Sequence, residues 1–67
     1  SLEVYSNVAI ISHTEDEFII DFMLKTRTQD DIVVSRVIMS PAQARRLNST
    51  LDKNIKNFDS ERGGRDG

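Results

Sequence analysis

Apolar side chains concentrate in three stretches of the chain, and polar clusters separate them. The stretches cover residues 3–12, 17–25 and 31–39, and each is rich in β-branched or aromatic residues. Runs of this length and composition are typical of β-strands. The gaps between them, residues 13–16 and 26–30, suit hairpins, whereas parallel strands need a long crossover. The pattern therefore predicts a three-stranded antiparallel meander.

A helix signal follows the third stretch. Ser40 is placed to cap the helix, Pro41 occupies the first helical position, and the side chain of Gln43 can reach back to the Ser40 amide. Beyond them, apolar residues recur at steps of three and four: Ala44, Leu47, Leu51, Ile55 and Phe58. At about 100° per residue they fall within roughly 80° of arc, so they form one narrow stripe. This predicts an amphipathic helix over about 41–58, packed on the meander through the stripe.

The expected architecture is a single α+β domain, β-β-β-α, over residues 1–58. Residues 59–67 carry no apolar side chain and include all three glycines of the chain. Such a segment has too little to bury to offset the entropy of ordering, so we expect a disordered tail.

The strands are more apolar than one helix can cover. In a sheet with one solvent-exposed face, apolar and polar residues should alternate along each strand, and in the second and third stretches they do not. We therefore expect a homo-oligomer, most simply a dimer, that completes the sheet through an uncovered face or edge. The predicted interface residues are Ile19, Met23, Val33, Val37 and Met39. The alternative is a small monomer with a few exposed aliphatic side chains.

Composition narrows the class of protein. The 67 residues allow one domain, and 37% apolar and 30% charged residues are consistent with a soluble fold. Without cysteine there is neither a disulfide framework nor a thiolate zinc site. The longest apolar run is four residues and no secretory leader is visible, so we expect no membrane span and a cytoplasmic location.

Candidate catalytic groups are few. His13 is the single histidine and precedes three carboxylates, but consecutive residues on a turn rarely converge on one metal ion. No nucleophile–base pattern and no glycine-rich phosphate loop is present, so we expect no enzyme, no metal and no cofactor. Asp21 and Arg36 lie within apolar strands, which predicts a cross-strand ion pair in preference to an anchor for a bound ligand.

A basic helix face offers an alternative function. Arg45, Arg46, Lys53 and Lys56 lie within roughly 100° of arc opposite the apolar stripe. Residues 42–67 carry six basic and four acidic groups, while residues 1–41 carry three and seven. Phosphate contacts of nucleic acid fit such a face. However, the sequence pI of about 5.2 and the absence of an aromatic platform favour a solvated face.

Several blocks of the sequence resemble a known family. Residues 4–7 (VYSN), 12–14 (SHT), 17–22 (EFIIDF) and 36–41 (RVIMSP), followed by the apolar positions of the helix, are similar to the domain-of-unknown-function family 3467. The resemblance covers residues 4–58. It implies a small bacterial or archaeal protein of uncharacterised function and carries no catalytic residue. The wholly acidic turn after SHT departs from the family, whose members often carry a proline or bulky aromatic residue there.

Together these patterns favour an interaction module that binds another protein or its own copies. Two alternatives stay open. One is nucleic-acid binding through the basic helix face. The other is chaperone-like binding of unfolded segments, because strands followed by one amphipathic helix resemble the layout of SecB-like chaperone subunits.

Overall fold

A computed structural model describes residues 3–66, with side-chain surroundings for residues 3–62. Strands β1 (Val8–His13), β2 (Phe18–Leu24) and β3 (Ile32–Met39) form one antiparallel sheet in the order β1-β2-β3. Helix α1 (Pro41–Asp66) follows β3 after a single residue, Ser40. The predicted α+β fold, β-β-β-α, is confirmed. The first strand begins at Val8, later than the expected start at residue 3.

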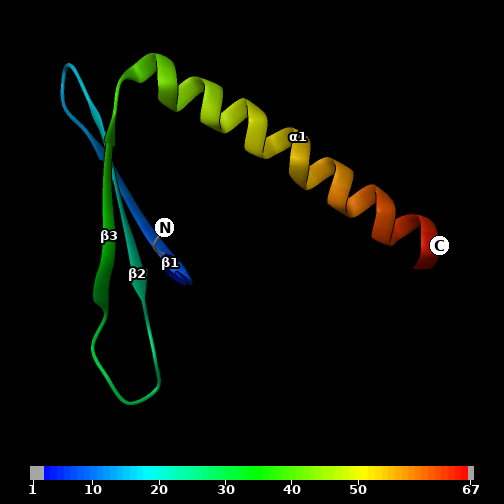
Figure 1. The fold of residues 1–67 in the computed structure, drawn as a ribbon, viewed down its shortest axis with the longest axis horizontal. Helices are drawn as coiled ribbons and strands as arrows, with labels where there is room; N and C mark the ends of the chain where they lie inside the picture. The colour runs from blue at the N-terminus through cyan, green and yellow to red at the C-terminus, as the bar shows by residue number, and fades with distance from the viewer. Residues whose placement is uncertain (1–2, 67) are drawn as a thin grey trace.

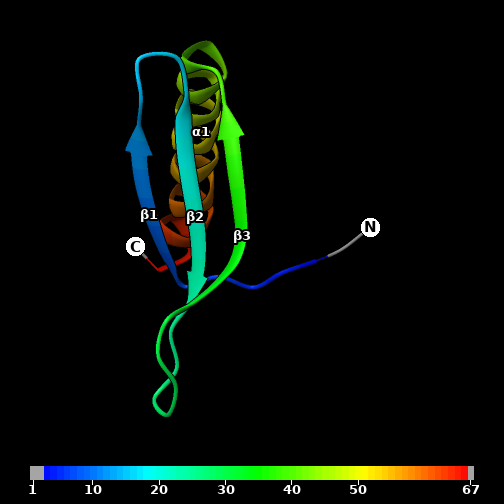
Figure 2. The same ribbon diagram turned by 90° about the vertical axis from the view of Figure 1, so that its left-hand side faces the viewer.

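The pairing of the strands assigns each side chain to one of two faces. Residues directly opposite each other in an antiparallel pair point to the same side. Pairs such as Ile11↔Ile20 and Ile20↔Val37 therefore define an inner face, the side on which α1 lies. Pairs such as Ile10↔Asp21 and Asp21↔Arg36 define the outer face. Figure 2 looks onto the sheet with α1 behind it.

A β-bulge breaks simple alternation in β3. Phe22 pairs with Ser35 and Met23 pairs with Val33, so Val34 is the extra residue on β3. A bulge of this kind shifts the side chains beyond it to the opposite face. Val33 consequently lies on the outer face with Met23, although strict alternation along β3 would put it with Val37 and Met39.

Helix α1 leaves the sheet instead of lying along it. Figure 1 shows α1 starting at the end of β3 and diverging from the strands towards its C-terminus. Within residues 3–62, Ile20 is the single buried hydrophobic side chain, at 8% exposure, while Leu51 is 55% exposed and Phe58 56%. The prediction that the whole apolar stripe packs on the meander is therefore wrong beyond its first residues. Sequence periodicity identifies an apolar face but does not fix the angle at which a helix leaves a strand.

The chain is too extended for a compact monomer of its size. Its accessible surface is 5982 Å², whereas a folded monomer of 7.6 kDa is expected to expose about 4,300 Å². Its radius of gyration is 15.2 Å, against about 11 Å for a compact 67-residue domain. Roughly 1,700 Å² of surface thus exceeds what a self-contained fold leaves open.

The helix also runs further than the apolar spacing predicts. It continues from Phe58 through Asp66, where we expected a disordered tail over residues 59–67. Residues 59–62 contain no proline, and the Arg62 guanidinium lies 5.3 Å from the Phe58 ring centroid, a favourable contact one turn apart. No glycine among the described residues has a positive φ, so no left-handed cap ends the helix at Gly63. Gly67 lies outside the described residues.

Candidate protein-interaction site

The candidate site is the open cleft between α1 and the inner face of the sheet, which we call the apolar cleft. Its volume is about 400 Å³. The sheet wall consists of Ala9, Ile11, Phe18, Ile20, Phe22 and Met39, and the helix wall of Ala44, Leu47, Asn48 and Leu51. Nine of these ten side chains are apolar, so the cleft suits an apolar occupant and holds no charged group to bind an ionic ligand.

The junction at Ser40 positions the helix wall. Ser40 Oγ accepts a hydrogen bond from the Gln43 amide at 3.1 Å, which confirms the predicted N-cap. The Ser40 carbonyl accepts the first helical bond from Ala44 at 2.9 Å. The Gln43 side chain takes a different partner from the one expected, because its Oε1 accepts from Arg46 at 3.2 Å. The helix start is therefore fixed directly after β3, with Ala44 facing the strands.

The apolar stripe of α1 divides into two parts at Leu51. Ala44, Leu47 and Leu51 line the apolar cleft. Ile55 and Phe58 lie beyond the residues that line this cleft and are about half exposed. Because exposed aromatic and aliphatic side chains in a row commonly mark an interface, the distal part of the stripe belongs to the candidate site as well.

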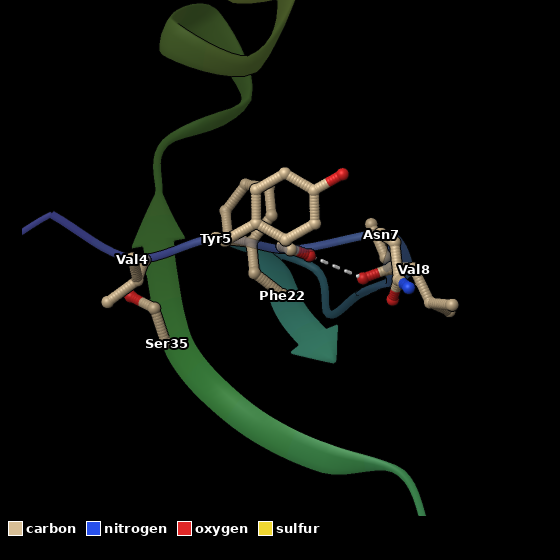
Figure 3. A pocket seen from close by; sticks show the side chains of 8 residues that line it. Val4, Tyr5, Asn7, Val8, Phe22 and Ser35 are labelled. Atoms are coloured by element: carbon tan, nitrogen blue, oxygen red, sulfur yellow. Dashed lines mark hydrogen bonds between the residues drawn. The ribbon is translucent and has the colours of Figure 1, made fainter. Parts of the chain in front are cut away.

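A second hollow, of about 650 Å³, lies under the N-terminal segment, residues 3–7. Figure 3 shows Val4 beside Ser35 and the ring of Tyr5 beside Phe22, both inner-face residues. The segment therefore crosses the inner face at the end far from the start of α1.

Asn7 holds this segment to the sheet. Its side-chain amide donates to the Lys25 carbonyl at 2.9 Å, and its Oδ1 accepts from the Lys25 amide at 2.8 Å. The Asn7 backbone amide also donates to the Met23 carbonyl at 3.1 Å, and Ser6 Oγ lies 2.8 Å from that carbonyl. Asn7 thus extends the β1–β2 pairing beyond Val8 through both its backbone amide and its side chain. Sequence analysis missed this role, although the VYSN block contains both residues.

The outer face carries the predicted ion pair at its centre. Arg36 Nε donates to Asp21 Oδ1 at 2.6 Å and Arg36 Nη2 to Oδ2 at 2.9 Å, a two-point contact. The Asp21 side chain is 18% exposed and that of Arg36 62%. The hydrogen bond from Arg36 lowers the pKa of the Asp21 carboxyl, against a smaller opposing effect of desolvation. This pair is structural, and its charges satisfy each other.

The five predicted interface residues do not share one face. Ile19, Met23 and Val33 lie on the outer face, whereas Val37 pairs with Ile20 and Met39 with Phe18 on the inner face. The β2–β3 register places Val37 and Met39 on the face opposite to Ile19 and Met23, and the bulge at Val34 accounts only for the position of Val33, so the five cannot form one continuous surface. Ile38, which pairs with Ile19 on the outer face, was not among them.

The acidic turn after β1 is a self-contained structure. Thr14 Oγ1 accepts hydrogen bonds from the amides of Asp16 and Glu17 at 3.2 and 3.1 Å. The His13 ring stacks on Phe18 with 5.4 Å between centroids. Within the described part of the chain, no group of three or more histidine, aspartate or glutamate side chains gathers as a metal site would require.

The basic helix residues are partly engaged with neighbours on the same helix. Arg46 donates to Gln43, and Lys56 forms an ion pair with Asp52 at 2.9 Å, one turn earlier. Arg45 borders a small hollow with Phe18 and Pro41, at the start of α1. Local pairs of this kind are typical of a solvated helix surface and contribute little to stability.

Over residues 3–66, no helix is both long and apolar enough for a membrane crossing.

A short antiparallel meander with one C-terminal helix and an open apolar cleft defines a small α+β domain. A family model described as "Protein of unknown function (DUF3467)" matches residues 2–64. The chain therefore belongs to this family, as the sequence blocks predict. Comparison with curated proteins gave no match, and comparison with solved structures gave none.

Proposed function

We propose that this protein is a non-catalytic protein-interaction module that associates with its own copies through the apolar cleft and the stripe of α1. One observation carries the proposal: the apolar stripe, which a self-contained domain would bury, stays about half exposed from Leu51 to Phe58. Exposing these side chains to water is unfavourable by about 25 cal/mol per Å² of apolar area. Association with a second protein surface relieves this cost.

The amount of surplus surface agrees with this role. The excess of roughly 1,700 Å² per chain over a compact monomer exceeds the ~800 Å² that each partner buries in a standard interface. For two chains the excess is about 3,400 Å², which falls in the range of roughly 2,000–5,000 Å² that obligate homodimers bury in total. A non-catalytic role and a cytoplasmic location are part of the proposal and rest on the sequence. The single histidine, His13, stacks on Phe18.

Sedimentation equilibrium over a range of concentrations tests the proposal directly. We expect a species of twice the chain mass at micromolar concentration and a melting temperature that rises with concentration. A folded species of single-chain mass, with concentration-independent melting, would refute it.

Chaperone-like binding of unfolded segments is the second candidate, and the same open apolar cleft favours it. An extended apolar segment would occupy the cleft transiently. The measurement is light scattering of an aggregating model substrate with and without this protein. Suppression of aggregation that competes with self-association supports this candidate, and unchanged scattering at a molar excess of this protein rejects it.

A further inference from the structure

We infer that the apolar cleft of each copy is filled by the distal half of α1, around Ile55 and Phe58, from a second copy. The exchange is reciprocal about a two-fold axis. The inference rests on the proposed self-association and specifies which surfaces meet.

The division of the stripe at Leu51 is the first argument. The proximal residues Ala44 and Leu47 form a wall of the cleft, so they are already part of a groove. The distal residues Ile55 and Phe58 extend past it and are about half exposed, with the Arg62 guanidinium lying over the Phe58 ring. A groove and an exposed apolar helix face on one molecule are the two halves of a helix-in-groove contact, with anchors spaced by three or four residues. When two copies are related by a two-fold axis, the helix of each copy can occupy the groove of the other.

The N-terminal segment supplies the second argument, because it opposes closure of α1 on its own sheet. Residues 3–7 cross the inner face at the end towards which α1 runs, with Val4 and Tyr5 over Ser35 and Phe22 (Figure 3). Asn7 fixes this segment through its paired hydrogen bonds with Lys25. The N-terminal segment therefore occupies the part of the inner face on which the distal half of α1 of the same chain would have to pack.

Charge decides between exchange of helices and stacking of sheets. Residues 1–41, which contain the whole sheet, carry three basic and seven acidic groups, a net charge of −4. Residues 42–67 carry six and four, a net charge of +2. Two sheets stacked by their outer faces would bring two acidic halves together. A helix of one copy against the sheet of the other places opposite charges together, which favours this association over the stacked one.

The test is cross-linking between copies, for which the absence of cysteine gives a clean background. Asn54→Cys places a thiol on the distal half of α1 beside the stripe and leaves its apolar side chains intact. Ile11→Cys places one on the inner face, and Ile10→Cys is the matched control, since these neighbours on β1 are 63% and 55% exposed on opposite faces. Pairs of single variants are refolded together from denaturant and treated with a short bismaleimide.

We expect a covalent heterodimer from Asn54→Cys with Ile11→Cys, and at least a tenfold lower yield with Ile10→Cys. Sedimentation equilibrium of each variant accompanies the cross-linking. Equal yields from both pairs, or a higher yield from Ile10→Cys, in variants that remain dimeric would overturn helix exchange while leaving self-association in place. If Ile11→Cys alone dissociates the dimer, the inner face is supported as the interface. A monomeric wild-type protein would instead remove the proposed function itself.

Discussion

Asp21 and Arg36 occupy paired positions on β2 and β3, and their two hydrogen bonds join the strands across the centre of the outer face. The carboxylate is the better shielded of the two groups. The pair is therefore a local determinant of strand register, and its strength depends on the protonation state of Asp21.

The Asp21–Arg36 pair predicts a pH dependence of stability. The pKa of Asp21 lies below its ordinary value of 3.8 because Arg36 donates to the carboxylate. A carboxyl whose pKa is lowered by folding stabilises the folded state at pH values above its ordinary pKa. This stabilisation is lost as the pH falls through the pKa of the folded state. Arg36→Gln should raise the pKa of Asp21 towards 3.8, measured by NMR titration of the carboxyl carbon. Lys25→Gln, with the same loss of charge, is the control. An unchanged Asp21 pKa in Arg36→Gln would contradict the assignment.

Leu51→Ala should separate folding from association. Full burial of a leucine makes its truncation cost about 2–5 kcal/mol, but Leu51 is half exposed in a single chain. We therefore expect a modest change in melting at low concentration and a loss of the concentration dependence seen in the wild type. Thr50→Ala, on the polar side of α1, is the control. Equal shifts at all concentrations would mean that Leu51 acts only within its own chain.

The N-cap of α1 predicts a small, local effect. Ser40→Ala removes the acceptor of the Gln43 amide and should lower the free energy of unfolding by about 1 kcal/mol. Urea denaturation followed by circular dichroism measures it. Ser40→Asp retains an acceptor at the same position and should restore stability. Equal stability of the Ala and Asp variants would show that the cap does not matter.

Asn7→Ala should loosen the end of the β1–β2 ladder. Two hydrogen bonds to Lys25 are lost, each with a net contribution of about 0.5–1.5 kcal/mol. The specific readout is hydrogen exchange of the Lys25 amide, which should accelerate strongly in Asn7→Ala. Asn7→Asp keeps the acceptor and should protect that amide more than alanine does. Exchange of the Ala44 amide, on the helix, serves as the internal reference.

Nucleic-acid binding has a direct test. Arg45→Glu combined with Lys56→Glu reverses two charges of the basic face and should abolish any salt-sensitive binding to an oligonucleotide, because phosphate contacts release counterions. Fluorescence anisotropy at two salt concentrations measures it. Binding that survives this double variant, or no binding by the wild type, removes the alternative.

Local signals in the sequence were sufficient for the elements and their order. The strand stretches, the Ser40 cap and the Asp21–Arg36 pair depend on neighbours in the chain or in an adjacent strand, and the structure contains all three. The divergence of α1 was not predictable, because the angle of a helix depends on tertiary contacts that a narrow stripe does not specify. The bulge at Val34 was also missed. One inserted residue leaves the composition of β3 unchanged but moves Val33 to the other face.

The meander is built only from strands that are adjacent in sequence. The complete sheet can therefore form without any contribution from α1. Contacts between near neighbours form quickly, so the inner face, with Ile11, Phe18 and Phe22, can be complete and exposed to solvent before a second chain is bound. A folding chain thus passes through a stage in which its apolar inner face is uncovered. The rate at which chains find their proper contact then competes with aggregation.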